Sequence, residues 1–166
     1  MPELISQSTS KMEIKEINRF SIRVFNAVLK LLSQLVSDSK SMTEDHFRGI
    51  LKSENTHFFI AELENKQIVG MLTIGTYDIP SGTKVWIEDV VVDDSQRGKG
   101  IGKELTLFAI GFARSLDAES VELTSRPSRI AANQLYKKLG FVLRETNVYR
   151  YTLKSNPVKQ TNISES

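Results

Sequence analysis

The chain has 166 residues and a formal net charge of +2, which argues against a protein that binds nucleic acid by neutralising its phosphates. It contains no cysteine, which excludes a disulfide framework, a thiolate metal site and a cysteine nucleophile. The two histidines, His46 and His57, fall in different predicted elements, so we expect no metal site. We expect no membrane segment and a cytoplasmic location, because no apolar run reaches about 18 residues and no signal peptide opens the chain.

The length suits one domain over residues 1–166, with an ordered core at 12–153 and polar termini. Alternation over 12–17 predicts a strand, and a broad apolar stripe over 19–37 predicts a helix. Thr43, followed by two acids, is typical of the start of a short helix that ends at about Lys52. Three strands are then expected, over 57–63, 67–77 and 83–93.

A helix is predicted from Ile101, because apolar residues recur on one helical face up to Leu116. The residues that follow predict a strand over 120–124, a proline-containing loop, a helix over 130–139 that ends at Gly140, and short strands at 141–143 and 147–153. This order is typical of a mixed α/β protein with one sheet.

Residues 96–103 read Gln-Arg-Gly-Lys-Gly-Ile-Gly-Lys and join the predicted strand at 83–93 to an amphipathic helix. Three glycines at this junction let the backbone adopt positive φ or approach a ligand closely. Free N–H groups at a helix start, with cationic side chains beside them, are typical of a phosphate site. The alternative is a tight surface turn between a strand and a helix.

Two common phosphate motifs fail on spacing. A P-loop requires glycine at position 97, which is Arg97, and Ser or Thr at position 104, which is Glu104. The dinucleotide pattern G-x-G-x-x-G requires glycine at position 103, which is Lys103. The pattern R-x-x-G-x-G is met by Arg97, Gly100 and Gly102. It resembles the pyrophosphate-binding motif of the GNAT (Gcn5-related N-acetyltransferase) family, in which acetyl-CoA lies at this turn.

A second segment also resembles this family. Ala132, Tyr136, Gly140 and Phe141 match the GNAT pattern A-x-x-x-Y-x-x-x-G-F, and the order of elements over 12–153 is that family's order. The resemblance implies an α/β GNAT (acyl-CoA N-acyltransferase) fold, with a mixed central sheet of about seven strands and helices on both faces. It also implies acetyl-CoA as co-substrate, with no metal.

The resemblance further implies which residues hold the cofactor. The glycine turn would bind the pyrophosphate, a helix asparagine would donate a hydrogen bond, and main-chain groups of a splayed strand would bind the pantetheine arm. Core packing is the alternative for the valine side chains of that strand. The cofactor-binding residues predicted in this way are Val90, Val91, Val92, Arg97, Gly98, Lys99, Gly100, Ile101, Gly102, Lys103 and Asn133.

Two adjacent acids, Glu88 and Asp89, interrupt an apolar strand. Regular alternation would point them to opposite faces of the sheet, and an acid in such a run needs a partner or a function. We interpret Glu88 as the general base that takes the ammonium proton, and Asp89 as a substrate-binding or structural partner. The choice between the two as base stays open at this point, and a salt bridge or an edge position is the alternative for each.

The GNAT resemblance makes Tyr136 the general acid that protonates the leaving thiolate, while an anchor between helix and core is the alternative. In GNAT folds the late strand borders the acceptor pocket. Tyr149 and Arg150 are therefore predicted to contact the acceptor, with ordinary strand surface as the alternative.

The chain is thus predicted to be an enzyme that transfers the acetyl group of acetyl-CoA to a primary amine by direct attack in a ternary complex. A small-molecule acceptor is favoured, and a protein N-terminus or lysine is the alternative. A rival hypothesis is a non-catalytic acyl-CoA-binding sensor or interaction protein, and a nucleotide-binding ATPase fits the spacing poorly. No nucleic-acid or membrane partner is expected, and the exposed edge near 147–153 suggests a possible homodimer.

Overall fold

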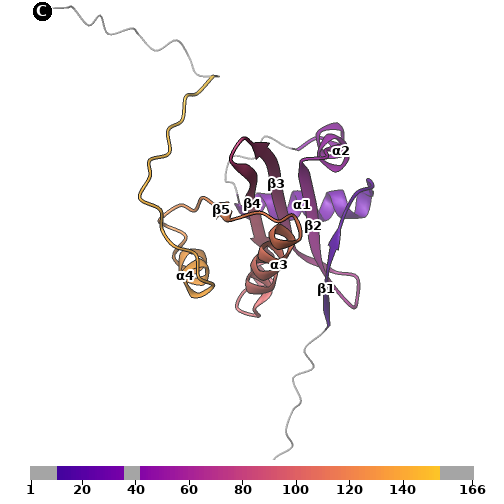
Figure 1. Ribbon diagram of the computed structural model, residues 1–166. Helices are drawn as coiled ribbons and strands as arrows, with labels where there is room; N and C mark the ends of the chain where they lie inside the picture. The colour runs from indigo at the N-terminus through magenta and orange to yellow at the C-terminus, as the bar shows by residue number, and fades with distance from the viewer. Residues whose placement is uncertain (1–10, 36–41, 154–166) are drawn as a thin grey trace, which may run out of the picture.

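The computed structural model describes residues 11–35 and 42–153, and its strands form one sheet in the order β1-β2-β3-β4-β5 (Figure 1). The first four strands pair antiparallel, and β5 runs parallel to β4. The mixed sheet predicted from the sequence is confirmed, with five strands in place of about seven. The strands are β1 (Met12–Glu16), β2 (Thr56–Leu63), β3 (Ile68–Ile79), β4 (Gly82–Val92) and β5 (Val121–Leu123).

Four α-helices and a 3₁₀ turn complete the described chain, and they follow the predicted order. The Thr43 side chain caps its helix as predicted, because its hydroxyl oxygen accepts a hydrogen bond of 3.2 Å from the N–H of His46. Residues 36 and 37 of the helix predicted over 19–37 lie outside the described residues. The elements are α1 (Ile22–Leu35), α2 (Glu44–Lys52), η1 (Asp94–Gln96), α3 (Ile101–Ser115) and α4 (Ile130–Lys138).

The sheet has an apolar core on each face. On one face α1 and α2 bury an aromatic cluster around Phe47, whose ring meets that of Phe58 edge-on with centroids 5.2 Å apart. On the other face α3 packs Leu105 and Ala109 against Leu72 and its neighbours on β2, β3 and β4 (Figure 1). Both sides of the central strands are therefore buried, as the long apolar runs in the sequence require.

The strands predicted at 141–143 and 147–153 are wrong for the described structure, in which these residues form no strand. After α4 the chain runs away from the sheet (Figure 1), and its apolar side chains from Val142 onwards are exposed, Tyr149 to 89%. Strand β5 has only three residues, so its free edge offers few backbone groups for pairing. The alternating pattern of these segments is therefore compatible with a strand, but in the described chain they pair with no other strand.

Helix α1 is fastened to the rest of the fold by side chains along its length. Near its start, Arg23 donates to the carbonyl of Lys66 at 2.9 Å, and in its middle Lys30 lies 2.6 Å from Asp93. At its end, the carbonyl of Leu35 accepts a hydrogen bond of 3.4 Å from Arg129, at the start of α4. Within residues 11–35 and 42–153, no helix is both long enough and apolar enough to cross a membrane.

The Lys30–Asp93 pair makes the stability of the fold depend on pH. The Lys30 ammonium, with hydrogen bonds from Ser95, lowers the pKa of Asp93 from 3.8 to about 2. Stability that rests on this ionised carboxylate is therefore complete above pH 4 and lost as the pH falls towards 2. We expect Asp93→Asn to lower the free energy of urea unfolding at pH 7, and its difference from wild type to shrink between pH 4 and 2. The same difference at both ends of that range would contradict the assignment.

Candidate active site

The glycine turn leaves β4 and leads directly into α3. Gly98 and Gly100 have φ values of 78° and 83°, in the left-handed region that other residues rarely adopt. A Cβ atom at either position would meet nothing within 4 Å, so glycine is required by the backbone conformation and the space beside the turn is open. The glycines thus set the backbone conformation of the turn, and no other atoms crowd the space beside Gly98 and Gly100.

The first turn of α3 presents backbone N–H groups beside cationic side chains. Gly100 is the N-cap of α3 and makes no side-chain hydrogen bond to the first N–H groups of the helix, an arrangement typical of anion-binding helix starts. Arg97 forms an ion pair of 2.6 Å with Asp94, and Lys99 donates to Gln96 at 2.8 Å. These contacts lie at the exposed surface, where a phosphate can compete for the same cations. The turn has the donors that the sequence predicts for a pyrophosphate.

Helix α4 lies close to the start of α3. A Cβ atom on Gly102 would sit 3.6 Å from a methyl group of Leu135 in α4 and 3.7 Å from a methyl group of Val92 in β4. The carbonyl of Gly102 accepts a hydrogen bond of 2.7 Å from the buried hydroxyl of Thr106. The turn, the end of β4 and the helix that carries Tyr136 are therefore neighbours.

Strand β4 parts from β5 just before the turn. In the described chain the two strands pair at three positions, from Val85↔Val121 to Ile87↔Leu123. Val90, Val91 and Val92 pair with β3 on their other side, and these valines pack in the core. Among the described residues, the stretch 88–92 thus has a strand partner on the β3 side only, and its predicted role in binding the cofactor stays a prediction.

A β-bulge falls where the two strands part. Asp89 pairs with Thr73 and Ile87 pairs with Ile74, so the register skips Glu88. Ile87 and Val90 both pack on the α3 face, although residues three apart in a regular strand would point to opposite faces. The prediction that the two acids point to opposite faces is therefore wrong, because the bulge interrupts the alternation. Glu88 is exposed, whereas Asp89 is half-buried opposite Thr73.

Asp89 and Tyr136 share an electrostatic neighbour, Arg129. Burial raises the pKa of Asp89 above its usual value, and a hydrogen bond from Thr73 and the charge of Arg129 oppose that rise. Burial likewise raises the pKa of Tyr136, again opposed by Arg129. One guanidinium therefore acts on an acid from β4 and a phenol from α4, although the two are far apart in sequence. This arrangement places two groups suited to proton transfer around one cation.

Asn133 organises the loop before α4. Its side-chain N–H₂ donates to the carbonyls of Arg126 at 2.9 Å and Arg129 at 3.0 Å. Both of its donors are thereby used inside the protein, a role that the sequence analysis missed. Its predicted hydrogen bond to the cofactor stays a prediction.

The sequence analysis did not predict two residues that contact each other beside the turn, Asp93 and its partner Lys30. The local sequence could have predicted the role of Asp93, since an Asp side chain often accepts a hydrogen bond from the backbone two residues later in a turn. In the structure, Asp93 accepts hydrogen bonds from Ser95. No local pattern marks Lys30, which lies 63 residues away in sequence.

The structure does not bring Tyr149 and Arg150 to this site. Both are exposed on the segment that follows α4, and the Tyr149 hydroxyl accepts a hydrogen bond of 3.4 Å from Asn147 of the same segment. Their role in acceptor binding stays a prediction.

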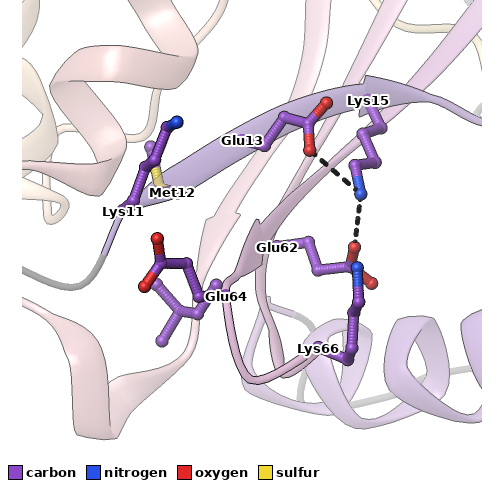
Figure 2. Close-up of a pocket in the computed structure, with 8 residues that line it drawn as sticks. Lys11, Met12, Glu13, Lys15, Glu62, Glu64 and Lys66 are labelled. Carbon is purple, nitrogen blue, oxygen red and sulfur yellow. Dashed lines mark hydrogen bonds and ion pairs between the residues drawn. The ribbon is translucent and has the colours of Figure 1, made fainter.

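A separate hollow of about 500 Å³ is lined by residues of β1, the end of β2 and the turn that follows β2, and by none of the glycine turn (Figure 2). Its central contact is buried Glu62, whose carboxylate lies 2.6 Å from the Lys15 ammonium and 2.8 Å from Arg23. Lys15 is the main cause of the lowered pKa of Glu62. Since the charge of Glu62 is already balanced by Lys15 and Arg23, we interpret these ion pairs as contacts that hold the edge strand β1 on the sheet.

Comparisons with known proteins agree with this geometry. Residues 25–141 match the sequence model of the Acetyltransferase (GNAT) family. An uncharacterised N-acetyltransferase of Methanocaldococcus jannaschii is 31% identical over 103 residues, which are 60% of this chain and 45% of that protein. The aminoalkylphosphonate N-acetyltransferase of Salmonella typhimurium is 25% identical over 142 residues, 83% of this chain and 92% of that protein. The chain thus spans less than half of the first relative and most of the second.

Solved structures share the fold. An aminoglycoside acetyltransferase from an uncultured soil metagenomic sample, in complex with trehalose, superposes with a TM-score of 0.75 at 25% identity, covering 86% of this chain and 97% of that one. An aminoglycoside N-acetyltransferase in complex with CoA has a TM-score of 0.71 at 19% identity, covering 91% and 100%. The matched residues make up more than half of the chain, and with them the glycine turn and the parted strand show that this protein belongs to the GNAT family of acetyltransferases.

Proposed function

We propose that this acetyltransferase transfers the acetyl group of acetyl-CoA to the primary amine of a small molecule, by direct attack within a ternary complex. The parting of β4 from β5, directly beside the open glycine turn, carries the proposal. Relatives named as aminoalkylphosphonate and aminoglycoside acetyltransferases support a small amine as acceptor. The chain contains no cysteine to carry a thioester intermediate, which favours direct transfer.

In this proposal the cofactor follows the path that the backbone leaves open. Its pyrophosphate lies on the first N–H groups of α3, with Arg97, Lys99 and Lys103 nearby. Its pantetheine arm follows the main chain of residues 90–92 and passes Asn133 of α4, whose side-chain oxygen would accept a hydrogen bond because its N–H₂ is engaged within the protein. Gly98, Gly100, Ile101 and Gly102 contribute backbone alone.

The acceptor nitrogen attacks the thioester carbonyl, so a C–N bond forms as the C–S bond breaks. A carboxylate at the β4 bulge takes the proton of the ammonium, and Tyr136 gives a proton to the departing thiolate. The sequence favours Glu88 as the base. The half-buried position and raised pKa of Asp89 now favour that residue, since a base with a higher pKa accepts a proton more readily. Glu88, exposed at the bulge, is then a contact for the acceptor.

The acetyltransferase proposal is tested by release of CoA thiol from acetyl-CoA, measured with a panel of amines. We expect release that depends on a small amine such as an aminoalkylphosphonate, an amino sugar or an aminoglycoside. An acyl-CoA sensor would bind the cofactor and release no thiol with any amine. Preference for peptide amines over every small amine would favour the protein-acetylating alternative.

The proposed proton-transfer groups predict different effects of three variants on the same assay. Asp89 must be ionised to act as a base, so kcat/KM falls as the pH falls through its raised pKa. We expect Asp89→Asn to lower kcat by about 100-fold and to remove this acid limb. Tyr136→Phe should lower kcat while leaving the affinity for acetyl-CoA unchanged.

Glu88→Gln is the matched control, because it neutralises the adjacent acid at the same bulge. We expect it to retain the acid limb of the pH profile. Loss of that limb in Glu88→Gln and its retention in Asp89→Asn would make Glu88 the base. A Tyr136→Phe variant that loses cofactor affinity at unchanged kcat would remove the general-acid role.

We also propose that the protein forms a homodimer through the segment after α4, which pairs as a strand with the same segment of a second copy. Alternate residues Tyr149, Tyr151 and Leu153 are exposed on this extended segment and would share one face of such a strand. An exposed apolar patch of this kind is typical of an interface. This pairing would also place Tyr149 and Arg150 beside the second copy.

Tyr149→Lys combined with Tyr151→Lys tests the dimer. We expect a dimeric mass for the wild type in light scattering after gel filtration, and a monomeric mass for the double variant. Thr152→Lys, on the alternate face of the segment, should remain dimeric. A wild type that is monomeric at micromolar concentrations would contradict the proposal.

A further inference from the structure

Two residues of helix α1, one helical turn apart, contact the segment that joins β4 to the glycine turn. The Lys30 ammonium donates to a carboxylate oxygen of Asp93 at 2.6 Å. Gln34, four residues later and so on the same face of α1, accepts a hydrogen bond of 2.9 Å from the N–H of Asp94. A single helix face therefore holds the first two residues after β4, which lead into the glycine turn.

Asp93 fixes the direction in which the chain leaves β4. Its N–H donates to the carbonyl of Val69 at 2.9 Å, and its own carbonyl accepts from Gln96 at 2.8 Å. One carboxylate oxygen accepts from both the N–H and the hydroxyl of Ser95, at 3.0 and 2.7 Å, while the other faces Lys30. Five hydrogen bonds within the protein thus set the path of the chain towards the glycines of the turn.

Lys30 supplies the charge that this arrangement needs. The Asp93 side chain is 5% exposed, whereas that of Lys30 is 65% exposed. A buried carboxylate is costly without a partner, so removing the ammonium leaves Asp93 under-compensated and free to turn towards water. Rotation of Asp93 would release Ser95 and, with it, the conformation that places Arg97 and the N–H groups of α3.

We propose that Lys30 and Gln34 are positioning residues for the phosphate end of the cofactor, acting through Asp93 and Asp94. The proposal rests on the proposed function, in which the glycine turn binds the phosphates of CoA. Both residues act from the outside of the turn, because their polar groups are engaged with it and not with the space beside Gly98 and Gly100. They are expected to govern cofactor affinity and to leave the reacting groups untouched.

The test compares Lys30→Met with Lys15→Met. Lys15 makes a matched contact, since its ammonium lies 2.6 Å from buried Glu62, but it does so at the edge strand. CoA binding is measured by calorimetry, and turnover is measured with acetyl-CoA and with acetyl-pantetheine, which lacks the pyrophosphate. We expect Lys30→Met to weaken CoA binding by about tenfold, the size expected for losing one charged hydrogen bond. It should leave kcat and the use of acetyl-pantetheine near wild type.

Lys30→Arg should restore most of the affinity, and Lys15→Met should bind CoA like the wild type. Unchanged CoA binding in Lys30→Met would overturn the positioning role while the proposed function stands. Equal loss in Lys30→Met and Lys15→Met, or loss with acetyl-pantetheine as well, would also overturn it, since either points to general destabilisation. A wild type that binds no CoA would overturn the proposed function first, and this inference with it.

Discussion

In the part of the chain that the structure describes, strand β4 pairs beyond Ile87 along one edge only, and the candidate site depends on this one-sided pairing. Backbone groups in the interior of a sheet are normally used up by both neighbours. Here the bulge at Glu88 coincides with the end of pairing to β5, so the strand bends away at the point where its acids stand. The glycine turn at the end of the same strand then adds a second set of N–H groups. The end of pairing at the bulge and the glycine turn thus leave backbone donors and acceptors along one stretch of the chain.

The two acids nearest this path, Asp89 and Asp93, differ in how much of their charge the protein compensates. Asp93 has a lysine and a serine on its oxygens, and its pKa is low. Asp89 is half-buried with only a threonine and the charge of Arg129 to oppose desolvation, and its pKa is raised. The first arrangement suits a structural anion, and the second suits a group that exchanges a proton. Asp89, which we propose as the base, thus lies four residues before Asp93, which holds the turn.

The sequence was sufficient for features that depend on local pattern, and insufficient for those that depend on distant partners. The helices, the Thr43 cap and the glycine turn follow from periodicity and from residues next to one another. The bulge could not be predicted, because the apolar residues around Glu88 suit either face of a buried strand and mark no inserted residue. The prediction of strands at 141–143 and 147–153 was wrong because alternation indicates only which side chains share a face. Whether a segment pairs depends on a neighbouring strand edge that is long enough to pair with it. The contacts of Lys30 and Arg129 join segments far apart in sequence, which no local pattern encodes.

The ion pair between Arg97 and Asp94 has a consequence for selectivity among anions. Because Arg97 is already neutralised by a carboxylate of its own turn, a simple anion such as chloride gains little by replacing that partner. A ligand with several linked phosphates can engage the guanidinium and the start of α3 at once, and the second contact then occurs at high effective concentration. The turn would therefore discriminate by the number and spacing of negative charges, and abundant monovalent ions would leave it in its free form.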